Sequence, residues 1–114
     1  MDTNVLLKMA NEEIENPDVL IDPFDLTFIW VCDKTCEKTG YGKNELDGKS
    51  MFTICPEYKP KTEMEVNMIT DPAKERNIPI VTKEGKHIIF HVKSVPIKPQ
   101  DYPVLAGKIM SISE

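Results

Sequence analysis

The segment 37–49 constrains the fold of this chain more than any other part of the sequence. It reads EKTGYGKNELDGK, and Gly40 and Gly48 stand on either side of a short run whose apolar anchor is Leu46. Glycine adopts left-handed backbone angles without steric cost, so it suits the points where a helix ends and the chain turns. We therefore expect a helix that ends at Gly40, a further helical turn over 44–46, and a change of direction near Gly48.

Runs rich in β-forming residues on both sides of this segment predict strands. Two strands precede it, at 19–21 and 26–31, and three follow it, at 78–82, 87–97 and 104–113. Two strands, several short helices and then three strands describe an α+β domain. We expect a five-stranded antiparallel sheet with the short helices on one face.

The predicted strand 87–97 alternates between two kinds of surface. One set of side chains is Ile88, Phe90 and Val92, and the other is Ile89, His91 and Lys93. Successive side chains of a strand point to opposite faces, so the first set is expected to face the core and the second to face outward. Gly85 supplies the positive φ of the hairpin that precedes this strand.

Three further helical features are expected. Residues 4–15 have helical apolar spacing, from Val5, Leu6 and Met9 and from Leu7, Ala10 and Ile14, and Asn16-Pro17 ends the pattern. Asp33 is expected to cap the helix that leads to Gly40. Thr62 to Glu65 fits a capping box, which predicts a helix with Met64 and Met68 on one side. The organisation expected is an amphipathic helix at 1–16 followed by one globular domain at 17–114.

Size and charge exclude several classes of protein. A chain of 114 residues buries one core, and its net charge of −5 is not that of a nucleic-acid-binding protein. The longest apolar run, at 26–32, is far shorter than the roughly 20 residues that span a bilayer. The N-terminal residues lack the pattern of a secretory signal. We expect a cytoplasmic protein that contacts neither membrane nor nucleic acid.

The three cysteines, Cys32, Cys36 and Cys55, form an odd set, which favours reduced, mostly buried thiols. Cys32 and Cys36 are separated by three residues, whereas zinc sites and covalent haem use other spacings. No metal site is predicted. Catalysis is not predicted either, because the carboxylates accompany no nucleophile and base in a recognisable order and no phosphate-binding loop.

These motifs in this order resemble the PAS sensor domains. The first matching motif is Thr39-Gly40-Tyr41, at the end of the helix that leads to Gly40. The second is 45–49, which is similar to the family's Glu-Leu-x-Gly-Lys element. The third is the hairpin turn 83–85. At the end of the chain, 111–113 stands where many members carry Asp-Ile-Thr. The resemblance covers roughly residues 17–114 and implies the PAS fold.

The chain also departs from the family's pattern. Cys32 replaces an asparagine that many members carry, and Ser111 replaces the terminal aspartate, so two side-chain hydrogen bonds to the backbone are lost. Asp33 and other groups are then expected to cap the helix. The helical segment between Pro60 and Arg76, which in the family walls the ligand pocket, is also short.

The resemblance allows cofactors to be compared position by position. Flavin-binding members carry Gly-x-Asn-Cys where this chain has 48–51, and Met51 cannot act as the thiol nucleophile. Haem-binding members place a histidine on the helix before the third strand, whereas His87 and His91 are predicted on the fourth. Cys55 is the one candidate for attachment of a photoactive-yellow-protein chromophore, and no cationic neighbour activates it. The cofactor is therefore unknown, and flavin photochemistry and histidine-ligated haem are disfavoured.

The family geometry implies an apolar pocket between the sheet and the helices, or a filled core in its place. The candidate lining residues are Trp30, Met51, Ile54, Met64, Met68, Ile80, Phe90 and Ile109. Tyr41 and Tyr58 are candidates for polar contacts at the rim. Methionines pack adaptably and suit either alternative.

The resemblance implies a sensory module that senses a small ligand or mediates dimerisation and passes a signal to an effector domain, as in sensor histidine kinases. The helix 4–15 is expected to cover its own sheet or to pack also on a second copy. The interface residues expected for a homodimer are Val5, Leu6, Met9, Ile89, His91 and Val95. Two alternatives remain: an interaction module without a ligand, and a small α+β enzyme.

Overall fold

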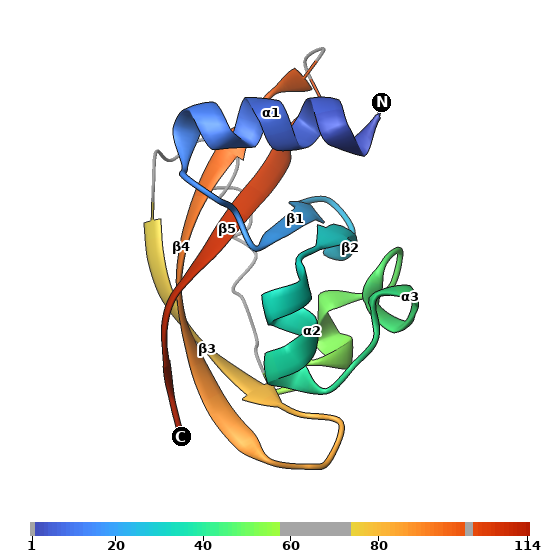
Figure 1. The fold of residues 1–114 in the computed structure, drawn as a ribbon, viewed down its shortest axis with the longest axis vertical. Helices are drawn as coiled ribbons and strands as arrows, with labels where there is room; N and C mark the ends of the chain where they lie inside the picture. The colour runs from blue at the N-terminus through green and yellow to red at the C-terminus, as the bar shows by residue number, and fades with distance from the viewer. Residues whose placement is uncertain (1, 58–73, 100–101) are drawn as a thin grey trace.

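A computed structural model describes residues 2–57, 74–99 and 102–114 (Figure 1). The elements in chain order are α1 (Thr3–Glu13), β1 (Val19–Asp22), β2 (Thr27–Val31), α2 (Asp33–Thr39), α3 (Lys43–Leu46), the 3₁₀ turn η1 (Met51–Thr53), β3 (Lys74–Val81), β4 (His87–Ile97) and β5 (Val104–Ser113). The predicted helix that opens at Thr62, with Met64 and Met68, lies outside the described residues, as does Tyr58. Within the described ranges, no helix combines the length and the apolar character that crossing a bilayer requires.

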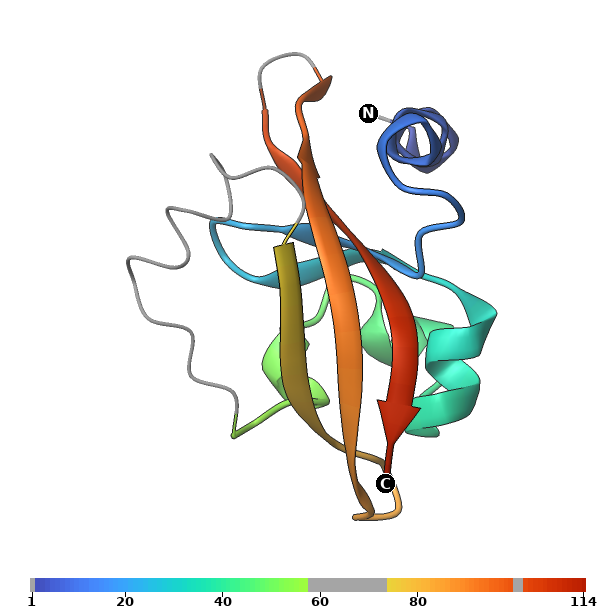
Figure 2. The ribbon, with the colours of Figure 1, turned by 90° about the vertical axis from the view of Figure 1, so that its left-hand side faces the viewer.

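The strands form one antiparallel sheet in the order β2-β1-β5-β4-β3. The last strand therefore lies between the N-terminal hairpin and the β3–β4 hairpin, and it joins the two halves of the chain. Figure 2 looks onto this sheet with β3, β4 and β5 toward the viewer. The predicted α+β class and the five-stranded antiparallel sheet are confirmed.

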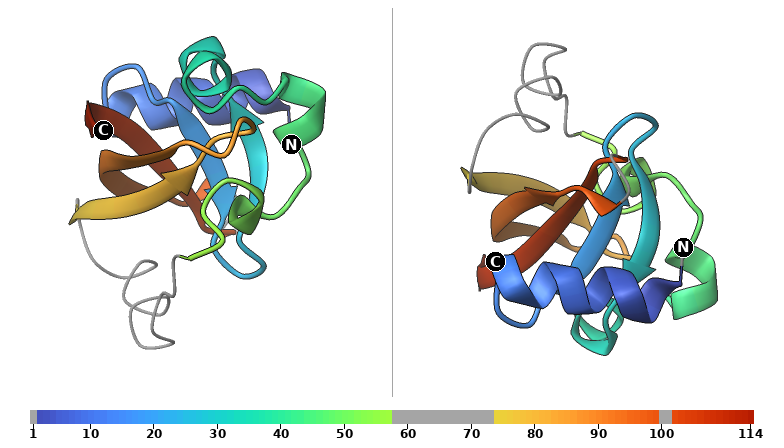
Figure 3. Two further views of the ribbon diagram at one scale, coloured as in Figure 1. Left: turned by 90° about the horizontal axis from the view of Figure 1, so that it is seen from below. Right: turned by 90° about the horizontal axis from the view of Figure 1, so that it is seen from above.

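Two hydrophobic clusters lie on opposite faces of the sheet. In β4 and β5, residues of one parity, such as Phe90 and Leu105, belong to the larger cluster beneath α2, α3 and η1. Residues of the other parity, such as Ile97 and Ala106, belong to the smaller cluster beneath α1. Figures 1 and 3 show α1 crossing the end of β4 and the start of β5. The N-terminal helix therefore covers the sheet of its own chain.

The glycines predicted to turn the chain adopt left-handed angles. Gly40 ends α2 with φ 81°, and Gly48 and Gly85 have φ 76° and 87°. The predicted cap of α2 is wrong by one residue. Cys32 is the N-cap and makes no side-chain capping bond, whereas Asp33 is the first helical residue. Cys32 is held instead by its backbone N–H, which donates to the carbonyl of Asp18 at 2.8 Å.

Candidate functional site

A small cavity of about 60 Å³ lies between the sheet and the segment that contains η1. Side chains from all five strands and from Leu26, Thr35 and the Met51–Cys55 segment line it, and nearly all of them are apolar. Five of the predicted pocket residues are brought together in its wall: Met51, Ile54, Ile80, Phe90 and Ile109. The remaining predicted residues are Trp30, which lies elsewhere, and Met64 and Met68, which are outside the described residues.

Trp30 packs against the cluster beneath α1 and does not line the cavity. The cause is an irregularity in the β1–β2 pairing, where Leu20 faces Trp30 but Ile21 faces Phe28. The extra residue, Ile29, breaks the alternation of β2, so Phe28 and Trp30 belong to different clusters although they are two residues apart. Expecting Trp30 in the pocket was wrong for this reason.

Arg76 is a cavity-lining residue that the sequence analysis missed. It lies on β3 with the same parity as Ile78 and Ile80, so its side chain is directed to the same face as theirs. The predicted strand began at Ile78, whereas β3 begins at Lys74 and pairs with β4 as far as Ser94. Arg76 is the only arginine in the sequence, and its spacing from Ile78 and Ile80 was the signal that would have found it.

The guanidinium of Arg76 is only partly satisfied by the described residues. Its Nη1 donates to the Ser94 Oγ on the neighbouring strand at 2.6 Å. Its Nε and Nη2 are buried and have no hydrogen-bond partner in the described part of the chain. A buried donor without a partner costs free energy, and more so when it carries charge.

Asp18 is a second buried polar residue, and it fixes α2 against β5. One carboxylate oxygen, Oδ2, accepts from the Ile109 N–H at 2.7 Å, and the other, Oδ1, accepts from the Cys32 thiol at 3.1 Å. Its carbonyl oxygen also accepts from the Thr35 hydroxyl at 3.3 Å. The Asp18 carboxylate thus supplies a hydrogen-bond acceptor to Cys32, which stands at the position where many PAS sensors carry an asparagine.

Helix α1 covers only part of its face of the sheet. The rest of that face, called the uncovered face below, carries Ile89, which is 41% exposed. Next to it, His91 Nδ1 lies 2.7 Å from Asn77 Oδ1 and its Nε2 lies 2.7 Å from Ser113 Oγ. On α1, Val5 is exposed and Met9 is partly buried.

Two of the predicted interface residues lie in a hydrophobic cluster of the chain itself. Leu6 on α1 and Val95 on β4 are both buried in the cluster beneath α1. The side chain of Val95 shares its parity with Ile89, but it lies in the part of β4 that α1 covers. For these two residues, the helix covers the sheet of its own chain, which is the first of the two arrangements considered.

The sequence profile of the PAS domain family matches residues 17–114. The chain belongs to the PAS domain family. PAS domains are generally regulatory modules without catalytic activity. A search of curated proteins found no match.

Three solved structures show how widely this PAS fold occurs. The PAS domain of a two-component sensor histidine kinase is 14% identical, with a TM-score of 0.66, over 94% of this chain and 98% of that one. A fungal light-oxygen-voltage (LOV) domain photoreceptor is 17% identical, with a TM-score of 0.66, over 94% and 90%. The PAS domain of the fruit-fly ELK potassium channel is 15% identical, with a TM-score of 0.61, over 96% and 98%. At these identities the likeness shows the fold.

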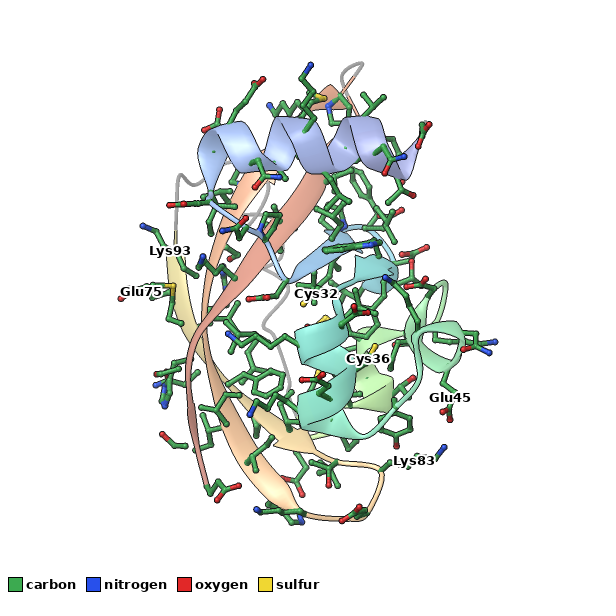
Figure 4. The ribbon with its side chains drawn as sticks, viewed as in Figure 1. Cys32, Cys36, Glu45, Glu75, Lys83 and Lys93 are labelled. Atoms are coloured by element: carbon green, nitrogen blue, oxygen red, sulfur yellow. The ribbon has the colours of Figure 1, made fainter. Side chains whose placement is uncertain are left out.

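The two PAS motifs of the sequence meet in space through one ion pair. Lys83, in the turn before β4, places its Nζ 2.8 Å from Glu45 Oε2 on α3, and Figure 4 shows the two side chains approaching each other. The same Nζ lies 5.8 Å from the ring centroid of Tyr41. The hydrogen bond from Lys83 is the main reason that the pKa of Glu45 lies below its usual value.

Burial raises the pKa of two of the three thiols of this PAS domain. Cys55 lines the cavity and donates to the Met51 carbonyl at 3.0 Å, and burial raises its pKa to about 12. Burial also raises the pKa of Cys36, although Lys43 opposes the effect. Both groups are therefore protonated at neutral pH, in which form they are poor nucleophiles. The described residues contain no cluster of three or more His, Cys, Asp or Glu side chains able to hold a metal ion.

Proposed function

We propose that this PAS domain is a sensory module that takes a small molecule in the cavity beneath η1 and passes the signal to an effector domain of a longer protein. The observation that carries the proposal is the cavity itself, which lies between the sheet and the Met51–Cys55 segment and is lined mainly by apolar side chains. Ligand sites in proteins are typically apolar concavities with a few convergent polar groups. Here the sheet forms one wall, so a ligand would contact β4 and β5 directly.

The route of the signal follows from the two faces of the sheet. Phe90 on β4 and Ile109 on β5 line the cavity. Residues of the opposite parity in these two strands either pack beneath α1 or lie on the uncovered face. A ligand that favours one packing of the sheet over another shifts the equilibrium between the two packings. α1 and the uncovered face are the elements through which an effector would sense that shift.

The proposed ligand is neither a flavin that forms a thiol adduct nor a histidine-ligated haem. Met51 lies in the cavity wall at the position that corresponds to the adduct-forming cysteine, and a thioether forms no such adduct. The described cavity wall contains neither histidine: His87 is exposed at the start of β4, and His91 bonds Asn77 and Ser113 on the other face. We place the protein in the cytoplasm, as a regulator of the sensor kinase kind.

The cavity is tested with xenon, a neutral probe that enters apolar cavities. Methyl NMR spectra are recorded as xenon pressure rises. We expect saturable shifts at Ile54, Ile80 and Ile109, and no comparable shift at Ile14 or Ile97 beneath α1. Native mass spectrometry and absorption spectra of the purified protein then report any molecule retained from the cell. Absence of shifts at the three cavity isoleucines would refute ligand sensing at this site.

A homodimer through the uncovered face is the second function, and the exposure of Ile89 favours it. Light scattering over a concentration series measures the mass of the wild type and of Ile89→Lys. We expect a dimer that Ile89→Lys dissociates and that Phe52→Lys, an exposed apolar residue on η1, leaves intact. A wild type that is monomeric at every concentration contradicts the dimer. Removing residues 1–15 is a poorer test, because it also uncovers Val95 and Ile97.

A further inference from the structure

The surface that the cavity offers to a ligand is entirely apolar within the described residues. Most of the wall consists of aliphatic and aromatic side chains such as Ile54, Ile80 and Phe90. Arg76 also lines the cavity, yet Nε and Nη2 of its guanidinium are buried and expose almost no surface. The methylene groups of Arg76 are therefore the part of its side chain that a ligand would contact.

The other polar groups of the described wall are bonded to the protein itself. The Thr35 hydroxyl and the Cys55 thiol each donate to a backbone carbonyl, at 3.3 and 3.0 Å. The Ser94 hydroxyl accepts from Nη1 of Arg76 at 2.6 Å. Burial raises the pKa of the Cys55 thiol to about 12, so this group carries no charge at neutral pH. A ligand in the cavity therefore meets neither a hydrogen-bonding partner nor an accessible charge in the described wall.

This wall discriminates between polar and apolar molecules. A buried water needs about two to four polar partners, so purely apolar cavities in proteins stay dry. A polar molecule that enters such a cavity loses its hydrogen bonds to water and gains none in return, which weakens binding by about tenfold or more for each unpaired group. An apolar molecule has no such bonds to lose and gains dispersion contacts with the wall. The cavity therefore selects neutral, apolar ligands.

The volume of the cavity limits the size of such a ligand. One water molecule needs about 10 to 15 Å³ of cavity volume, whereas a cavity of about 150 Å³ takes benzene. The volume here is about 60 Å³ and lies between these values. It has room for roughly three or four non-hydrogen atoms. Dispersion contacts increase with the number of atoms, so a molecule that fills this volume binds more tightly than a diatomic gas.

We propose that the ligand of the cavity is a light hydrocarbon of about three or four carbon atoms, bound by dispersion contacts alone. This inference rests on the proposed ligand-sensing function and names the chemical class of the ligand. For a ligand of about four non-hydrogen atoms, the highest ligand efficiency gives a dissociation constant no lower than roughly 0.04 mM. The domain would thus respond to concentrations at or above this level.

Propane and isobutane are the probes, and ethanol and isopropanol are polar counterparts with the same number of non-hydrogen atoms and the same branching. Each is added to the purified chain, the alkanes as gases under pressure, while the isoleucine methyl NMR signals are followed. We expect saturable shifts at Ile54, Ile80 and Ile109 with both alkanes. The dissociation constant of each alcohol is expected to be at least about tenfold higher than that of its alkane. Benzene is expected to give no saturable shift, because it exceeds the volume of the cavity.

Ile54→Phe fills the cavity, and Ile14→Phe is the matched control. Ile54 is the C-cap residue of η1, and Ile14 is the C-cap residue of α1. Both are buried, in clusters on opposite faces of the sheet, and of the two only Ile54 lines the cavity. The alkane shifts at Ile80 and Ile109 are expected to disappear in Ile54→Phe and to persist in Ile14→Phe. If Ile54→Phe does not fold, the comparison of alkane with alcohol in the wild type decides the outcome.

Equal affinity for alkane and alcohol, or no saturable shift with either alkane, overturns the hydrocarbon inference. If xenon nevertheless shifts Ile54, Ile80 and Ile109, the cavity remains a ligand site and only the ligand class is wrong. If xenon also has no effect, the proposed sensing function fails together with the inference. Benzene that binds as tightly as isobutane overturns the size limit, and alkane shifts that persist in Ile54→Phe overturn the location.

Discussion

The carboxylate of Asp18 accepts a 2.7 Å hydrogen bond from the backbone N–H of Ile109, a residue 91 positions later in the chain. Asp18 precedes β1, and Ile109 lies in β5 two residues beyond Gly107, the last residue of β5 that pairs with β1. The N–H of Ile109 is thus bonded by a side chain where the β1 strand partner has ended. The same carboxylate accepts from the thiol at the start of α2.

Asp18→Ala is expected to lower the free energy of unfolding by about 2 to 3 kcal/mol, because it leaves the buried Ile109 N–H without an acceptor. Urea denaturation measures the change. Asp33→Ala is the control, since Asp33 is exposed at the first turn of α2, and it is expected to cost less than about 1 kcal/mol. Equal losses in the two variants would show that Asp18 does not anchor β5.

Gly107→Ala is expected to destabilise the protein by about 1 to 3 kcal/mol, because an added Cβ would lie 2.9 Å from Val19 Cγ2 on the neighbouring strand. Adding Val19→Ala removes that methyl group, so the double variant should lose less than the sum of the two single changes. Gly42→Ala is the matched control, since φ there is −75° and the added Cβ would meet the Glu45 side chain only at 3.4 Å. Additive losses in the cycle would contradict the clash.

The Glu45–Lys83 pair predicts a component of stability that depends on pH. The hydrogen bond from Lys83 lowers the pKa of Glu45 from its ordinary value of 4.5, so folding favours the ionised carboxylate. That contribution is fully present above pH 4.5 and is lost as the pH falls through the lowered pKa of the folded state. Thermal unfolding of the wild type and of Glu45→Gln across this range should converge at low pH, and salt should weaken the difference. Parallel curves at all pH values would show that the pair contributes nothing.

The three thiols should differ in reactivity. Cys55 is 1% exposed and its pKa is raised to about 12, so iodoacetamide at pH 8 should label it far more slowly than the partly exposed Cys32. Peptide mapping by mass spectrometry gives the rate at each site. In denaturant all three rates should become similar, which serves as the control. Rapid native labelling of Cys55 would mean that the segment after η1 opens readily.

The sequence by itself determined the class of fold and the places where the chain turns. Gly40, Gly48 and Gly85 were predicted to adopt positive φ because no other residue does so at equally low cost, and the structure has them there. The strands were predicted from alternation, and so were the cavity residues Phe90 and Ile80. Both kinds of evidence are local, since they depend on the residue and its near neighbours along the chain.

The tertiary structure alone decided which residues share the cavity. The extra residue in β2 sends Trp30 to the cluster beneath α1, and the early start of β3 brings Arg76 into the cavity wall. Both outcomes depend on pairing with a neighbouring strand, and a one-residue change of register reverses the face of every side chain beyond it. For the same reason, the side chain of Asp18 acquires a role only when β5 lies beside β1.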